Sequence, residues 1–213
     1  MKSRIIFLLM LSLFLIGCTT SAESNTETTE EEQPVETNDS RVVTIQEKTF
    51  EMDDLDFYTL MNKVKLMLQK EADANENNVS YYEEQLEYYE NINVNLQSLI
   101  ELYAMSLLAE EKNYFVPDEK LRDAVEDFNE QVAGSEEATE LVEEFGREMY
   151  NRNIEEYIRE TILRDRIAGE LEAELQEENP EAMEREINYL LEKKFEDLYM
   201  DQLSTLEMEI HLQ

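Results

Sequence analysis

The amino-acid sequence predicts a mainly α-helical domain whose two ends are joined by short paired strands. Between residues 53 and 198, apolar residues recur at intervals of three and four, the spacing of one helix face. Segments with the residue types and alternation of β-strands lie near the two ends, at 41–46 and 207–213. Hydrophobic residues make up 42% of the chain, so it can build a core.

The first 18 residues predict a bacterial lipoprotein signal peptide. Lys2 and Arg4 precede an apolar run at 5–16, and the segment closes on the lipobox LIGC at 15–18. As a helix the run would extend roughly 18 Å, too short for a bilayer core of about 30 Å. We therefore expect residues 1–17 to be cleaved and Cys18 to carry a diacylglyceryl lipid, whose two acyl chains suffice for stable attachment. This indicates the outer face of the cell membrane of a Gram-positive bacterium.

Residues 18–40 predict a lipidated cysteine and a flexible acidic tether, followed by one folded domain at 41–213. The tether has no periodic apolar residues and would span roughly 25 Å as a flexible coil. Cys18 is the single cysteine of the chain. No internal disulfide can form, so packing must hold the domain together.

The charge balance excludes some partners. Without Lys2 and Arg4 the mature chain has 16 basic and 52 acidic residues, a net charge of −36. Such a surface repels phosphate backbones and anionic headgroups, so we expect no nucleic-acid partner and no basic peripheral contact with the membrane. Acidic residues occur in every segment, which favours adaptation to the habitat over a dedicated site for cations or a basic partner.

The folded domain is predicted to begin with a short strand and a helix. The strand at 41–46 (RVVTIQ) is rich in β-branched residues and is followed by a polar bend at 47–48. Asp53 or Asp54 then caps a helix that ends near Lys70.

A second, long helix is predicted from Ser80 to about Lys112. Ser80 and Glu83 have the spacing of a capping box. We expect this helix to kink or divide near the asparagines of 91–95.

Four further helices are predicted, with bounds 117–134, 135–146, 151 or 153 to 175, and 179–198. The residues that begin them are Pro117, Ser135, Asn151 or Asn153, and the pair Asn179-Pro180. Gly134 and Gly146 end two of them.

The last residues predict a second strand. Met208, Ile210 and Leu212 alternate with polar residues and share one face. An isolated strand would leave backbone groups without partners, so we expect 42–46 to pair with 207–212. His211 falls on the outward face and is expected to be a solvated residue rather than a catalytic base.

Four segments also follow one another in a characteristic order. They are VVTIQEKTFEMDDLDFY (42–58), LIELYAMSLLAEEKNYFVPDEKL (99–121), FGREMYNRNIEEYIRETILRDRI (145–167) and LEMEIHL (206–212). In this order they resemble the N-terminal domain of the SurA family of chaperones and of PrsA-type foldase lipoproteins. The residues at 46–48 replace the usual Asn-Gly turn of that family. The resemblance implies a helical domain with paired terminal strands.

The family normally carries a parvulin prolyl-isomerase domain between its last two helices. Here only residues 169–180 occupy that place, too few for such a domain. The resemblance thus implies a non-enzymatic, chaperone-like module that binds unfolded or emerging secreted polypeptides. The alternative is an assembly or adaptor lipoprotein with one dedicated folded partner. The sequence indicates no oligomeric state.

Few motifs point to a chemical site. There is no glycine-rich phosphate loop, no nucleophile elbow and no His/Cys metal spacing, so we expect neither a cofactor nor a catalytic residue. Asp73, Asn75, Asn77 and Glu84 have the spacing of an EF-hand-like calcium loop, but Asn78 stands at its glycine position. An asparagine-rich loop between helices is the favoured interpretation.

Candidate contacts for client polypeptides are Tyr81, Tyr88 and Met105. In the doublets 81–82 and 88–89, one tyrosine can enter the core, while Tyr81, Tyr88 and Met105 line an outer flank. The resemblance implies a cradle of aromatic and flexible apolar side chains. Ordinary core or rim positions are the alternative.

Overall fold

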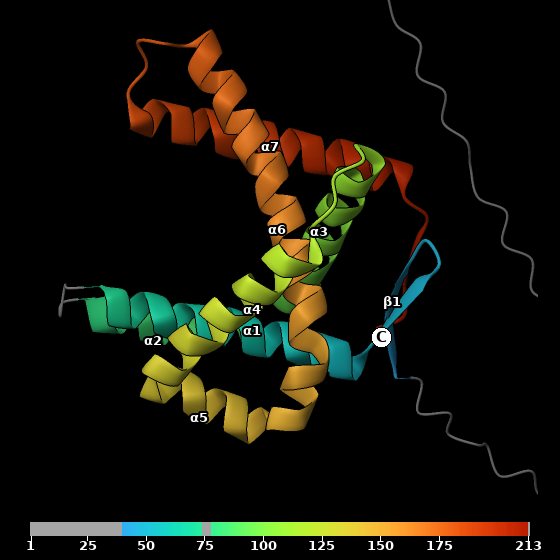
Figure 1. The fold of residues 1–213 in the computed structure, drawn as a ribbon. Helices are drawn as coiled ribbons and strands as arrows, with labels where there is room; N and C mark the ends of the chain where they lie inside the picture. The colour runs from blue at the N-terminus through green and yellow to red at the C-terminus, as the bar shows by residue number, and fades with distance from the viewer. Residues whose placement is uncertain (1–39, 74–77, 213) are drawn as a thin grey trace, which may run out of the picture. The chain divides into compact units, whose positions relative to one another are not determined.

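The computed structural model describes residues 40–73 and 78–212, all of which belong to the compact unit formed by residues 39–213. The described ranges are mainly helical, with a small three-stranded antiparallel sheet, as predicted (Figure 1). The signal peptide, Cys18 and nearly all of the tether lie outside the described residues. None of the described helices is long and apolar enough to cross a membrane.

The helices of the described ranges are, in chain order, α1 (Met52–Ala72), α2 (Val79–Tyr88), α3 (Ile92–Glu111), α4 (Asp118–Gly134), α5 (Glu136–Phe145), α6 (Arg147–Glu178) and α7 (Glu184–Thr205). The strands are β1 (Arg41–Ile45), β2 (Lys48–Glu51) and β3 (Met208–Ile210). Helix α6 packs against α3, α4, α5 and α7, and α1 packs against α3 and α5. Helix α6 therefore joins most of the fold.

The sheet confirms the predicted pairing of the two ends. Its strand order is β2-β1-β3, with Val43 opposite Ile210 and Ile45 opposite Met208. The backbone N–H of His211 donates to the carbonyl of Val42 at 2.9 Å, which extends the pairing beyond β3. The end of the described chain thus lies beside its beginning (Figure 1).

Strand β2 was not predicted. The predicted bend at 47–48 is shifted by one residue, because the two-residue turn of the hairpin is 46–47 and Lys48 begins β2. Gln46 at the start of the turn has a φ of 53°. Such turns need a left-handed first residue, for which glycine or asparagine is the usual choice. Because glutamine stands at that position instead, the sequence did not indicate the turn.

The first two predicted helices are shifted or divided. Asp54 accepts a hydrogen bond from the Glu51 N–H, so α1 begins before the predicted caps. The predicted long helix is divided into α2 and α3, and the side chain of Asn91 caps α3 by accepting from the Asn93 N–H at 3.0 Å. The Ser80 capping box is wrong, because α2 begins at Val79 and Ser80 lies inside it.

Three later helices begin one to six residues away from their predicted starts. Ser135 caps α5 as predicted, whereas Pro117 stands before the first helical residue of α4 rather than in it. Helix α6 begins at Arg147, because Gly146 with a φ of 107° makes the whole change of direction after α5. Helix α7 begins at Glu184, after Met183.

The C-terminal strand departs from the prediction in two respects. The His211 side chain is only 8% exposed, and its Nε2 lies 2.9 Å from the Thr44 hydroxyl, so it is not a solvated residue. Met208 and Ile210 do share a face, but β3 is an edge strand and leaves them 41% and 53% exposed. Their partners in β1 are completely buried.

Two isoleucines of this sheet provide a matched test of where the sheet contributes to stability. Ile45 is fully buried and Ile210 is 53% exposed. We expect Ile45→Ala to lower the free energy of unfolding by about 3 kcal/mol, through lost burial and a cavity. Ile210→Ala should cost less than about 1 kcal/mol. Urea unfolding followed by circular dichroism measures both, and equal losses would contradict the burial pattern.

Candidate functional site

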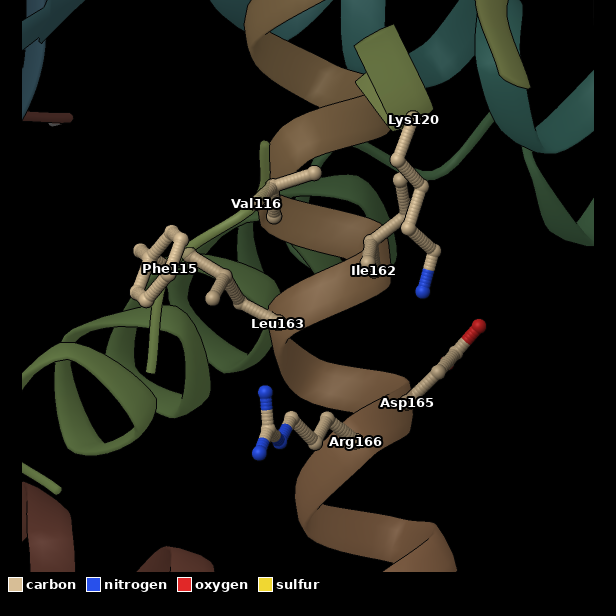
Figure 2. A pocket seen from close by; sticks show the side chains of 7 residues that line it. All are labelled: Phe115, Val116, Lys120, Ile162, Leu163, Asp165 and Arg166. Atoms are coloured by element: carbon tan, nitrogen blue, oxygen red, sulfur yellow. The ribbon is translucent and has the colours of Figure 1, made fainter. Parts of the chain in front are cut away.

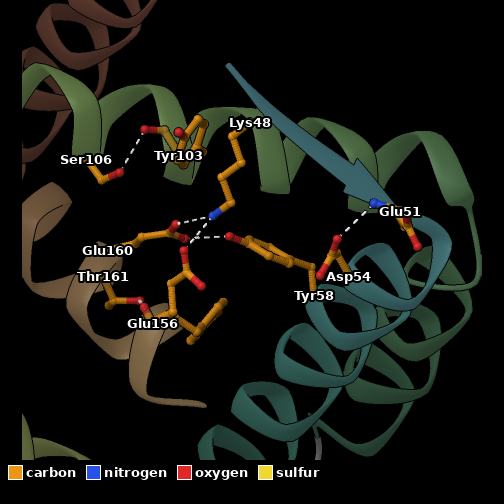
Figure 3. A network of polar contacts seen from close by, with 10 residues as sticks. Lys48, Glu51, Asp54, Tyr58, Tyr103, Ser106, Glu156, Glu160 and Thr161 are labelled. Atoms are coloured by element: carbon orange, nitrogen blue, oxygen red, sulfur yellow. Dashed lines mark hydrogen bonds and ion pairs between the residues drawn. The ribbon is translucent and has the colours of Figure 1, made fainter. Parts of the chain in front are cut away.

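Among the charged residues that the structure describes, the most buried is Glu160 on α6. Its side chain is 7% exposed, and it accepts a hydrogen bond from the Tyr58 hydroxyl of α1 at 2.5 Å. The Lys48 ammonium of β2 lies 3.3 Å from Glu160 and 2.6 Å from Glu156 (Figure 3). One lysine thus joins the hairpin to α6 and, through Glu160, to α1.

Aromatic rings complete the surroundings of this lysine. Its ammonium lies 4.4 Å from the ring centre of Phe50 and 4.6 Å from that of Tyr103, both cation–π contacts. Burial alone would lower the pKa of Lys48, but the carboxylates of Glu160 and Glu156 outweigh it and the pKa is raised. Burial raises the pKa of Glu160, against the opposing effects of Lys48 and Tyr58.

The cavity beside this network has a volume of only about 40 Å³. A cavity of that size has room for only a few water molecules. The network therefore joins the hairpin to α6 and α1 and leaves little free space beside it.

Larger hollows lie farther along α6. The first, which we call the Phe115 hollow, has a volume of about 510 Å³ and lies between α6 and the segment that leads into α4 (Figure 2). Phe115 is 75% exposed at its rim. The residues that line it are Phe115, Val116, Lys120, Ile162, Leu163, Asp165 and Arg166.

The second hollow, which we call the α7 groove, has a volume of about 640 Å³ and is formed by α3, α6 and α7. Its apolar lining consists of Ala168, Leu191, Phe195, Tyr199 and Met200, and its polar lining of Gln97, Glu101, Arg164, Asp165, Asn188, Glu192 and Glu196. Asp165 lines both hollows. The Phe115 hollow and the α7 groove therefore adjoin each other across α6.

Some charged groups of the α7 groove have an oppositely charged partner, and others do not. Asp165 is held by the Arg164 guanidinium at 2.6 Å. Burial raises the pKa of Glu101 even though Arg164 opposes it, and Glu101 has no hydrogen bond or ion pair within the described residues. Burial, with a contribution from Glu101, raises the pKa of Tyr199 to about 12. The half-buried Glu101 carboxylate is thus left without a bound cation.

The predicted client contacts have different outcomes. Tyr81 and Tyr88 are 53% and 54% exposed on α2, the outer position expected for them. Met105 is completely buried in a cluster with Leu163 and Ile167 of α6, so its predicted place on an outer flank is wrong. Neither tyrosine lines the Phe115 hollow or the α7 groove.

Residues that do line the two hollows were not singled out from the sequence. Phe115 stands in a non-helical segment, where an apolar residue outside a stripe was the available signal. Leu191 and Phe195 belong to the apolar stripe of the predicted helix at 179–198, whereas Tyr199 and Met200 lie beyond its predicted end. The sequence shows the stripe but not which part of it remains uncovered.

The possible calcium loop is described only in part. Asn75 and Asn77 lie outside the described residues. The Asp73 carboxylate accepts hydrogen bonds from the Asn78 amide at 2.7 Å and from the Tyr82 hydroxyl at 3.0 Å. Within 40–73 and 78–212, no group of three or more His, Cys, Asp or Glu side chains is arranged to hold a metal ion.

The chain matches no protein-family model, no curated protein and no solved structure. The resemblance to the SurA N-terminal domain therefore remains a prediction from the sequence.

The buried ion pair leads to a stability prediction with a matched control. Lys48 and Lys70 have similar side-chain exposures, 31% and 34%, but their partners Glu160 and Glu137 are 7% and 52% exposed. We expect Lys48→Met to lower the free energy of unfolding by about 3 kcal/mol, because it leaves a buried carboxylate without its cation. Lys70→Met should cost less than about 1 kcal/mol. Similar losses in denaturant unfolding would contradict this reading.

For the same variant, we predict that the loss of unfolding free energy depends on pH. The raised pKa of Glu160 means that the folded state binds this proton more tightly than the unfolded state. The resulting stability is complete below the ordinary pKa of 4.5 and is lost as pH rises through the folded-state pKa. Removing Lys48 raises that pKa further. The destabilisation by Lys48→Met should thus grow from pH 4.5 to pH 8, and a constant difference in unfolding free energy would argue against it.

Proposed function

We propose that this protein is a lipid-anchored, extracytoplasmic chaperone-like module that binds unfolded or emerging secreted polypeptides and has no prolyl-isomerase activity. The observation that carries the proposal is the pair of adjoining hollows on α6. Exposed Phe115 and Met200 contribute to their linings, and Asp165 is common to both. Exposed apolar side chains gathered at a concave surface are typical of sites that bind other apolar groups.

The composition of the two hollows supports many clients rather than one. Aromatic, aliphatic and methionine side chains alternate there with charged ones. Methionine adapts its shape to different partners, and both hollows are open rather than shaped around a single ligand. An extended chain laid across α6 at Asp165 would contact both linings.

The connection between α6 and α7 supports a function without isomerase activity. Residues 179–183 are all that separates these helices, and they hold no inserted domain. In the proposed protein, the lipid on Cys18 and the acidic tether keep the binding surface near the membrane. Emerging polypeptides would then meet it as they leave the membrane.

One observation favours the second candidate, an adaptor lipoprotein with a single folded partner. Strand β3 is an edge strand, and its Met208 and Ile210 are exposed. An edge strand can accept a strand from another protein. Crosslinking at the membrane surface separates the candidates, since many crosslinked proteins favour the chaperone and one stoichiometric partner favours the adaptor.

Aggregation of an unfolded client, followed by light scattering, tests the leading proposal. We expect the mature protein to suppress aggregation at a near-stoichiometric ratio, and Phe115→Ser and Met200→Ser to weaken suppression several-fold by removing apolar contact. Met183→Ser is the control, because Met183 is 74% exposed but lines neither hollow. Absence of suppression by the unmodified protein, in both low and high salt, would refute the proposal.

A further inference from the structure

We infer that the α7 groove selects polypeptide segments in which a lysine or arginine stands next to apolar residues. This inference rests on the proposed function and names the class of client. It follows from three properties of the groove: a fixed aromatic floor, carboxylates without cations, and the charge of the whole chain.

The aromatic floor is held by the core. Phe195 and Tyr199 are partly buried against the cluster that contains Met105 and Ile167. Met200 is 57% exposed beside them and is free to adapt. The groove therefore offers rigid rings for an apolar side chain and one flexible residue to cover it.

The carboxylates come from two helices. Glu101 on α3 is half-buried, and Glu192 and Glu196 on α7 are exposed. None of the three has a hydrogen bond or ion pair within the described part of the chain, and the groove's one arginine, Arg164, is already bound to Asp165. An ammonium or guanidinium group would supply the missing charge-assisted hydrogen bonds.

A basic side chain suits both features together. The hydrocarbon stem of lysine or arginine packs on apolar surface while its charged end reaches polar groups. In the groove the stem would lie over Phe195 and Tyr199, and the charged end would reach Glu101. A cation near these rings also gains from their negative faces.

The net charge of the whole chain also favours a basic segment in the groove. With 52 acidic against 18 basic residues, the protein attracts cationic segments and repels acidic ones. A second copy of this chain would bring the same negative charge to the groove. Long-range attraction and local pairing therefore favour a basic, apolar segment of another polypeptide.

Peptide binding tests the inference. Three fluorescently labelled peptides share length and apolar residues but carry lysine, glutamine or glutamate at the same two positions, and anisotropy measures their affinity for the mature protein. We expect the lysine peptide to bind about tenfold tighter than the glutamine peptide, the ratio that one net charge-assisted contact gives. The glutamate peptide should bind most weakly.

Variants that each remove one negative charge distinguish the effect of the α7 groove from the effect of the net charge of the chain. Glu101→Gln should reduce the preference for lysine several-fold and leave binding of the glutamine peptide unchanged. Glu196→Gln, at an exposed position where folding is not at risk, should act in the same direction. Glu126→Gln removes one charge from the exposed face of α4, outside the groove, and should leave the preference nearly intact.

The outcomes distinguish the inference from the proposed function. Equal affinity for all three peptides, or equal effects of Glu101→Gln and Glu126→Gln, would overturn the inference and leave chaperone binding in place. Binding of no peptide, together with no suppression of aggregation, would overturn both. A lysine preference that Glu101→Gln and Glu196→Gln both reduce would support it.

Discussion

The pairing of β1 with β3 is the constraint on which the rest of the described domain depends. Val42, Val43 and Ile45 of β1 are completely buried, and β1 is bonded on both edges. Because β3 must reach β1, α7 has to return toward the sheet after leaving the end of α6 (Figure 1). That return brings α7 against α3 as well as α6, and the α7 groove is the surface left between them.

The Lys48 network fixes how the hairpin meets the helices. Burying a lysine and a glutamate is costly unless their hydrogen bonds are made, and here Tyr58, Glu156 and Glu160 make them. Geometry of this kind disfavours other alignments of the hairpin, because any shift would leave Glu160 buried without its cation. The main effect of the network is therefore to hold β2 in one orientation, and its contribution to net stability is smaller.

Charge and exposed apolar surface are complementary in this protein. A net charge of −34 for the whole chain makes copies repel one another, which opposes self-association through the exposed Phe115 and Met200. The same negative charge would disfavour acidic partners at the proposed binding surface. Solubility and client choice would then have one physical origin, the excess of carboxylates.

The sequence by itself determined the helical class and the cap at Ser135, because periodicity and capping are local rules. It also determined the pairing of the two ends, because an isolated strand needs a hydrogen-bonding partner. It placed Met105 wrongly, on an outer flank, and Met200 lies beyond the predicted end of the last helix at 198. Only the tertiary structure covers Met105 with α6 and leaves Met200 at the rim of a groove. A stripe shows which face of a helix is apolar, but what covers that face is decided by segments far away in the chain.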